Sequence, residues 1–512
     1  MKRHALFVSL IVVLLSTGSA FAQTLGAVLT GSQETPPCAT PGFGNATVTF
    51  DSTRQNINVT ITVANLGSPI TASHIHNAAT GGNVVLGFTP TASFNNGTLT
   101  GTFPIPSDLT TQILQNPGNF YVNVHTNQCT GGAVRGSLAF ASGGPIMYAA
   151  ELRGANETPP NGSNAFGSAL VTFDSVNNTM AFEVGTSGIA SPSASHIHRG
   201  ASGVGGPVVI NFATTPSGFQ GGRVSGSGAI STLQSSSLLP SDLTGLASAT
   251  TANGFYVNVH SAAFGGGEIR GQLVPAQEVD IPVAGHVTNG IGQTFISDVR
   301  IFNPSFTAPT TALVEFFQAG TSPNAVATNS LVVNLPARGT AVLNDVAGTS
   351  GLNLTAVGAI RVSSVANVVA TSRIFVNTAG GSFGQFVPAF ARSQALRRGA
   401  IPQVSNTAAA NGFRSNVGFF NPNQSPVTVR LEARDASGNV VGSNLITLQA
   451  LSQQQNSIGT YFPGVDVSNA ANLTLSFDAS AGIFVYASEV DNTSGDTFLI
   501  PAQPDTGVAA SQ

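Results

Sequence analysis

Residues 73–76 read SHIH and residues 120–125 read FYVNVH, and both phrases return at residues 195–198 and 255–260. These two pairs of phrases hold six of the eight histidines in the chain. In FYVNVH the apolar residues Phe120, Val122 and Val124 alternate with residues that carry polar groups, as in a β-strand that has one face against a core. The sequence therefore predicts a duplicated β-domain whose strands carry three histidines in each copy.

Other landmarks recur in the same order around these phrases and extend the duplication. GSQETPP matches GANETPP, ATVTFDS matches ALVTFDS, PSDL appears twice, and GGAVRGSL matches GGEIRGQL. The landmarks predict two copies of one domain, at residues 23–142 and 146–275. A weaker duplication, in which VRIFNP at 299–304 matches VGFFNP at 417–422, predicts two further modules at residues 280–392 and 398–504.

The strands inside each module follow a period of two. Ala46, Val48 and Phe50 alternate with polar residues, and the runs 57–63 and 427–431 show the same pattern. Glycine, asparagine and proline clusters separate the strands at the spacing of a sandwich. We expect an all-β chain of four tandem antiparallel β-sandwich modules, the last two immunoglobulin-like. Short helices are expected only after Ser107 and Ser241.

The first residues predict export. Lys2 and Arg3 precede an apolar run, and small residues end at Ala22, which is typical of a signal peptide at residues 1–22 that is cleaved after Ala22. Cleavage removes two of the 18 basic residues and leaves 16 against 22 acidic ones, which disfavours nucleic acid as a partner. No later stretch is long and apolar enough for a transmembrane anchor in the mature chain.

The two cysteines, Cys38 and Cys129, both lie in the first histidine domain. Alignment of the copies places Asn161 and Phe264 at the equivalent positions, so the second domain lacks both cysteines together. Joint presence and joint absence predict a disulfide, and export makes its oxidation plausible. Metal binding by the two thiols is the alternative.

The histidine spacing predicts a metal site. His74 and His76, two residues apart in a strand, lie on one face with Ile75 on the other, and His196 and His198 repeat this arrangement. If the FYVNVH strand is a neighbour, its last residue joins the pair, which completes two trios. Three imidazoles suit copper or zinc, with one position open. The alternative is a metal-free polar cluster. The candidate ligands are His74, His76, His125, His196, His198 and His260.

A glutamate and an arginine also recur together, Glu34 with Arg135 and Glu157 with Arg270. We expect a salt bridge in each copy that ties the ETPP loop to the last strand. The alternative is that the carboxylate serves as a further ligand or proton acceptor beside the histidines.

The ordered set ETPP, VTFD, SHIH, FYVNVH and GGEIRGQL closely resembles the chordin-type domain, known as CHRD, twice over. The resemblance covers about half of the mature chain and implies extracellular β-sandwich modules. The first copy departs from the family pattern in the loop after His76 and at Ala133, which stands where the second copy has Glu268. The C-terminal pair resembles no family that we can name.

No complete catalytic set is evident. GGSFG at residues 380–384 matches the nucleophile-elbow pattern, but no histidine follows it, so we interpret it as a glycine-rich turn. We therefore expect no enzyme but a secreted, extracellular or periplasmic protein that binds an extracellular protein or surface ligand. The alternative function is a copper- or zinc-binding module, which could be redox-active, built on the histidine trios.

Overall fold

A computed structural model describes residues 24–51, 55–78, 82–90, 92–115, 119–140, 145–174, 179–213, 218–247, 254–320, 326–467 and 469–505. The signal peptide predicted at residues 1–22 lies outside these described residues. The chain divides into two compact units, with the boundary between residues 142 and 143. Within the described part of the chain, no helix has the length and apolar character needed to cross a membrane.

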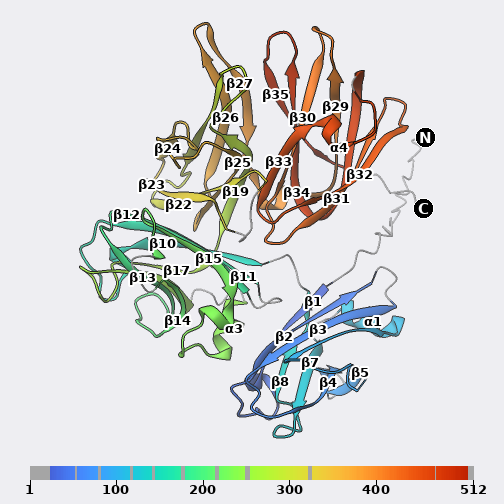
Figure 1. Ribbon diagram of the computed structural model, residues 1–512. Helices are drawn as coiled ribbons and strands as arrows, with labels where there is room; N and C mark the ends of the chain where they lie inside the picture. The colour runs from blue at the N-terminus through green and yellow to red at the C-terminus, as the bar shows by residue number, and fades with distance from the viewer. Residues whose placement is uncertain are drawn as a thin grey trace, which may run out of the picture. The chain divides into compact units, whose positions relative to one another are not determined.

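The first histidine domain is one curled antiparallel sheet (Figure 1). Its strands are β1 (Thr24–Thr30), β2 (Phe43–Phe50), β3 (Asn56–Ala64), β4 (Ile70–Asn77), β5 (Asn83–Gly87), β6 (Thr98–Pro104), β7 (Phe120–Thr126), β8 (Val134–Ser137) and β9 (Ala139–Phe140). They follow the order β5-β4-β7-β8-β1-β2-β3-β6, with β9 paired to β1. A single residue pair, Thr30 with Arg135, joins β1 to β8. The sheet folds around a core to which both of its halves contribute.

Alternating residues fill this core as the period of two predicts. Ala46, Val48 and Phe50 of β2 are buried, and so are the four apolar residues of β3 between residues 57 and 63. A short helix, α1 (Ser107–Gln115), starts at the predicted serine. The all-β prediction is confirmed.

The second histidine domain repeats the same sheet. Its strands are β10 (Ile146–Arg153), β11 (Phe166–Asp174), β12 (Thr179–Ser187), β13 (Pro192–Arg199), β14 (Val208–Ala213), β15 (Arg223–Ala229), β16 (Phe255–Ser261), β17 (Ile269–Gln272) and β18 (Val274–Pro275). The order β14-β13-β16-β17-β10-β11-β12-β15 matches that of the first domain position by position. Helices α2 (Ile230–Leu233) and α3 (Pro240–Leu246) follow β15, and α3 covers the predicted turn after Ser241.

The predicted disulfide is present and joins Cys38 to Cys129, with 6.2 Å between the Cα atoms. The second domain closes the same place with hydrogen bonds. The amide of Asn161, which stands where the first domain has Cys38, donates to the carbonyls of Gly267 and Glu268 at 3.1 and 3.0 Å. One domain is thus tied by a covalent bond and the other by an asparagine.

The third module is a sandwich of two five-stranded sheets. One sheet contains β19 (Gln277–Gly285), β22 (Thr310–Gln318), β23 (Asn329–Leu335), β25 (Val357–Ser364) and β28 (Phe390–Ala391). The other contains β20 (Val287–Thr288), β21 (Thr294–Phe302), β24 (Thr340–Leu343), β26 (Val369–Thr378) and β27 (Gly381–Pro388). Gly380 and Gly381 of GGSFG lie where β26 turns into β27, as the interpretation of a glycine-rich turn requires, and Gly384 lies within β27 opposite Phe375.

The fourth module is built on one eight-stranded sheet around the long strand β34. Its strands are β29 (Leu396–Thr407), β30 (Phe413–Asn421), β31 (Val427–Arg434), β32 (Val440–Leu448), β33 (Ser452–Ser457), β34 (Asn469–Asp491), β35 (Thr497–Pro501) and β36 (Gln503–Pro504), and α4 (Ile458–Tyr461) follows β33.

The repeated FNP phrase marks an equivalent joint in the third and fourth modules. Asn303 and Asn421 are fully buried, and each amide donates to three backbone carbonyls. Each side-chain oxygen also accepts a bond from the backbone N–H two residues on, from Ser305 or Asn423. The phrase recurs because a buried asparagine satisfies the backbone where the chain leaves the strand.

Replacement of both cysteines (Cys38→Ser with Cys129→Ser) is expected to destabilise the first domain alone, by roughly 2–4 kcal/mol, because the bond closes a long loop in the unfolded chain. Urea unfolding followed by hydrogen exchange of each domain measures the effect. The second domain, which has no cysteine, is the internal control. Equal protection of the first domain before and after the change would contradict the expectation.

Candidate metal centre

Two neighbouring strands bring each histidine trio together. β4 pairs with β7 so that His74 lies opposite Asn123 and His76 opposite Tyr121, while His125 lies opposite Ala72. Ile75 is fully buried in the core on the other face. The second domain repeats this register in β13 and β16, with His196 opposite Asn258. The predicted convergence of three histidines therefore occurs in both domains.

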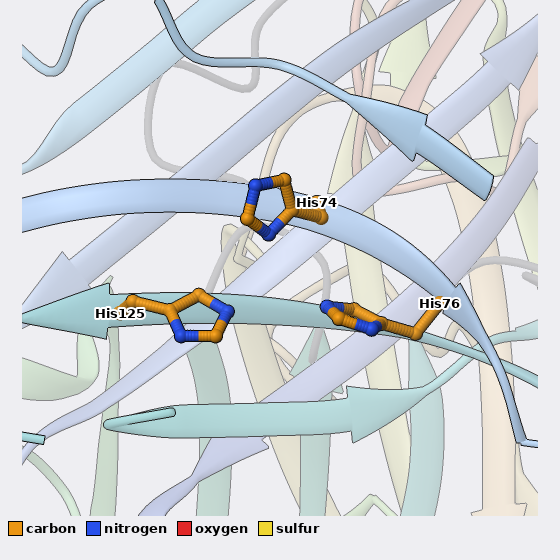
Figure 2. Close-up of side chains that lie close together, drawn as sticks. All are labelled: His74, His76 and His125. Carbon is orange, nitrogen blue, oxygen red and sulfur yellow. The ribbon is translucent and has the colours of Figure 1, made fainter. Parts of the chain in front are cut away.

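The three rings of the first trio face a common space (Figure 2). Their centroids lie 5.2 Å apart for His74 and His125, 5.5 Å for His74 and His76, and 6.1 Å for His76 and His125. The corresponding separations in the second trio are 5.0, 5.6 and 6.1 Å. In each trio one nitrogen from every ring lies within 4.8 Å of the others.

Backbone carbonyls hold two rings of each trio in a ligand-ready orientation. The Nδ1 atoms of His76 and His125 lie 2.8 and 3.0 Å from the carbonyl oxygens of Gly82 and Thr130. Those of His198 and His260 lie 2.9 and 3.0 Å from the equivalent carbonyls of Gly206 and Gly265. An Nδ1–H that donates to a carbonyl leaves Nε2 with a free lone pair, which is how metal-binding histidines are commonly oriented.

The nitrogens that face the common space are buried and have no hydrogen-bond partner. They are His74 Nδ1, His76 Nε2 and His125 Nε2 in the first domain, and His196 Nδ1, His198 Nε2 and His260 Nε2 in the second. Buried polar atoms in native proteins are normally satisfied, so the same three orphans in two diverged copies point to an external partner. A tetrahedral zinc ion would hold the nitrogens about 3.3 Å apart, and in each trio they lie no more than 4.8 Å from one another.

Burial also favours the neutral form of the imidazoles of His74, His76, His196, His198 and His260. Loss of solvent lowers the pKa of His74 and of His196 to about 4, and the neighbouring histidines of each trio lower it further. Burial likewise lowers the pKa of His76, His198 and His260, against the opposing effect of their carbonyl partners. A neutral imidazole binds a metal without first losing a proton.

An arginine and a tyrosine support one ring of each trio, which the sequence did not predict. Tyr121 stacks on His76 with 4.9 Å between the ring centroids, and the guanidinium carbon of Arg135 lies 4.6 Å from the centroid of the Tyr121 ring. In the second domain Tyr256 stacks on His198 at 4.8 Å, with Arg270 at 3.4 Å. The tyrosine of FYVNVH and the arginine of RG recur in both copies, and this recurrence is the sequence signal from which their contact could have been predicted.

The predicted salt bridges are wrong. Arg135 donates to the carbonyl of Gln33 and the hydroxyl of Thr35, and Arg270 donates to Thr158, so each arginine binds the ETPP loop beside its glutamate. No ion pair between these arginines and glutamates is found among the described residues. The loop is tied to the last strand, as expected, but through neutral oxygen atoms.

The two glutamates are buried, and burial disfavours their charged form. Burial raises the pKa of Glu34 and of Glu157 to about 7, although Arg135 and Arg270 act in the opposite direction. Glu34 packs against Gly132, whose φ of +136° and lack of a Cβ atom leave room for the carboxylate. Neither glutamate belongs to the groups of ligand atoms within 4.8 Å of one another, so the trios consist of histidines alone.

A family model for the CHRD domain matches residues 25–138 and again residues 148–273. The chain carries two tandem CHRD domains. CHRD domains are extracellular-type β-domains, and no family model matches the C-terminal half. Both histidine trios lie within the matched CHRD regions.

The other comparisons add little to the CHRD assignment. No curated protein matches the chain. Among solved structures, the protein of "Crystal Structure of Thermotoga maritima 1070" is 8% identical over 22% of this chain and 99% of its own, with a TM-score of 0.19. A likeness at this level carries no conclusion about fold or function.

Acid is expected to destabilise the metal-free CHRD domains through these histidines. Because the folded-state pKa of His74 and His196 lies below the ordinary value near 6.5, the unfolded chain takes up more protons as the pH falls from 6.5 to 4. The contribution of these two neutral histidines to the stability of the folded domains is therefore fully present above pH 6.5 and is lost as the pH falls toward 4. Urea midpoints of the chelator-treated chain at pH 7.5 and 4.5 measure it.

The matched variant replaces both residues (His74→Gln with His196→Gln) and should show a smaller fall in midpoint on acidification than the parent. An equal fall in parent and variant would show that these two rings do not titrate as their burial requires.

Proposed function

We propose that the chain is an exported, non-enzymatic binding protein whose two CHRD domains each hold one copper or zinc ion. The observation that carries the proposal is the set of three unpartnered imidazole nitrogens within 4.8 Å, present in both copies. Export is supported by the leader at residues 1–22 and by the disulfide between Cys38 and Cys129. A binding role without catalysis agrees with the extracellular type of the CHRD domain.

The donor set fits these two metals better than calcium or magnesium. Neutral imidazoles suit zinc and copper, whereas calcium and magnesium require oxygen ligands, and no carboxylate joins either trio. Three protein ligands leave one coordination position for water or for a group from a partner. The carbonyls of Gly82 and Gly206 orient equivalent rings although the loops that carry them differ in sequence, which supports equivalent sites in both domains.

Metal content of the purified mature chain tests the proposal. We expect close to two copper or zinc ions per chain in protein prepared without added metal, because both trios are complete. Replacement of His196 and His198 by alanine should leave one ion per chain. The matched control is His286→Ala, since His286 lies outside both trios and pairs with Asp345.

Elemental analysis counts the ions, and calorimetric titration of the chelator-treated protein with Zn²⁺ or Cu²⁺ gives the affinity. Absence of bound metal together with absence of tight binding in the titration would refute the metal proposal. An equal loss in the His286→Ala control would show that the effect is not specific to the trios.

A further inference from the structure

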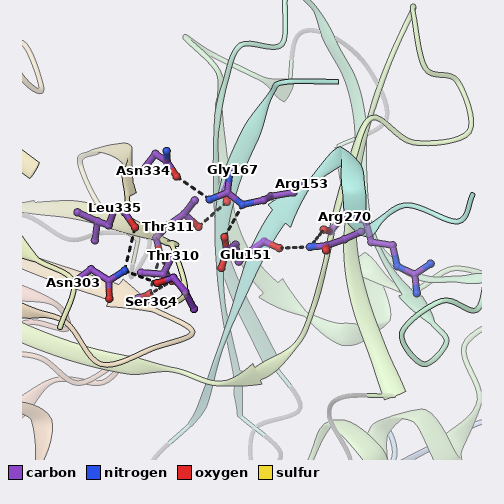
Figure 3. A network of polar contacts seen from close by, with 12 residues as sticks. Glu151, Arg153, Gly167, Arg270, Asn303, Thr310, Thr311, Asn334, Leu335 and Ser364 are labelled. Carbon is purple, nitrogen blue, oxygen red and sulfur yellow. Dashed lines mark hydrogen bonds and ion pairs between the residues drawn. The ribbon is translucent and has the colours of Figure 1, made fainter. Parts of the chain in front are cut away.

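The second CHRD domain and the third and fourth modules meet through side chains of both charges, most of them buried. Thr311 of β22 donates to the carbonyl of Gly167 in β11 at 3.0 Å, and Arg153 of β10 donates to Asn334 of β23 at 2.8 Å (Figure 3). These two contacts join β10 and β11, two central strands of the CHRD sheet, to the third module. A more deeply buried set of charged side chains lies at the same junction.

The charged set begins in the second CHRD domain. Glu183 of β12 forms an ion pair with Arg223 of β15 and accepts a bond from the hydroxyl of Ser330 in β23. Arg223 also donates to the carbonyl of Ala327 at 2.7 Å. One carboxylate and one guanidinium of the CHRD domain thus bind the third module directly.

A polar row then crosses the sheet of the third module. Neighbouring strands place Ser330 opposite Glu315, Glu315 opposite Arg361, and Arg361 opposite Asp280. Arg361 is 1% exposed, and its guanidinium pairs with Glu278 at 3.1 Å and with Asp280 at 3.2 Å. It also donates at 3.0 Å to the carbonyl of Pro422 in the fourth module.

The fourth module supplies hydrogen-bond acceptors at the end of this polar row. Arg392 donates to the same carbonyl of Pro422 and to the side chain of Asn423. A cavity of about 10 Å³ remains at the junction, lined among others by Glu183, Glu315 and Arg361, with Gln424 and Leu451 from the fourth module. All three modules therefore contribute atoms to one buried cluster.

The cluster contains one more acid than base. Its acids are Glu183, Glu278, Asp280 and Glu315, and its bases are Arg223, Arg361 and Arg392. Glu315 is the acid that has no ion pair within 4.0 Å among the described residues, and its Oε2 atom has no hydrogen-bond partner. Burial without an ion pair favours the protonated form of a carboxyl group over its charged form.

We infer that the three-module junction is an acid-tightened joint, which takes up a proton at Glu315 when it closes and loosens as the pH rises. Opening exposes Glu315 to water, where its charged form is no longer penalised. The joint thereby couples the second CHRD domain to the C-terminal modules in a pH-dependent way.

The electrostatics of the cluster agree with this joint. Burial raises the pKa of Glu315 to about 8, and Glu183, Glu278 and Asp280 act in the same direction while Arg361 opposes them. Burial also raises the pKa of Asp280 and of Glu183. Protonation of a carboxyl group whose pKa is raised in the closed joint stabilises that closed state. The stabilisation is complete below the ordinary carboxyl pKa and is lost as the pH rises to the pKa of the closed state. The opening equilibrium can therefore increase by up to about tenfold per pH unit between pH 4.5 and 8.

Thiol labelling of the full-length mature chain tests the joint. Ala327 is 4% exposed and its carbonyl binds Arg223, so Ala327→Cys places a thiol at the junction, and the native cysteines are already joined in the disulfide. We expect its labelling rate, corrected for the thiolate fraction, to increase at least tenfold from pH 5.5 to pH 8.5. The control thiol, Ala433→Cys, lies in the core of the fourth module and should show no such increase.

The charge is isolated by adding Glu315→Gln to Ala327→Cys, which should make the corrected rate nearly independent of pH. Glu315→Leu serves the same purpose if the glutamine variant does not fold. A pH-independent rate with the native glutamate, or an equal rise without it, would overturn the inference. The metal content of the CHRD domains does not enter this measurement, so the two proposals succeed or fail separately.

Discussion

Antiparallel pairing of two short strands is the constraint on which the candidate site depends. The period of two puts Ile75 into the core and its two neighbours on the opposite face, and the register of β4 with β7 then decides which residue of FYVNVH they meet. A slip by one residue would turn the histidines of a strand into the core. Burial of the apolar face therefore fixes the position of the ligands, and the duplicated domain preserves both together.

Much of this arrangement could be predicted from the sequence because it follows from local periodicity. Strand alternation, the two HxH pairs and the disulfide all rest on spacing or on comparison of the two copies. The carbonyls of Gly82 and Gly206 could not be predicted, because they come from loops of different sequence whose path depends on the folded domain. The expected pairing of Glu34 with Arg135 failed for a related reason, since the arginine found uncharged oxygen atoms nearer.

The module junction was beyond sequence reasoning for a different physical reason. Glu315 interrupts an apolar strand, and a charged residue in such a run is ordinarily placed at a surface. Here β22 is buried almost throughout, because the second CHRD domain and the fourth module cover the face that Glu315 occupies. Only contacts between distant segments reveal that this face is internal, and no periodic pattern encodes them.

The exchange of Cys38 for Asn161 gives the two CHRD domains different sensitivities to their surroundings. The first domain is held at this place by a disulfide, and the second is held by hydrogen bonds of an asparagine amide, which thiol reductants do not break. In a reducing milieu the amino-terminal copy would loosen while its twin kept its shape. A single polypeptide thus carries two versions of one scaffold, of which only one registers the redox state of its environment.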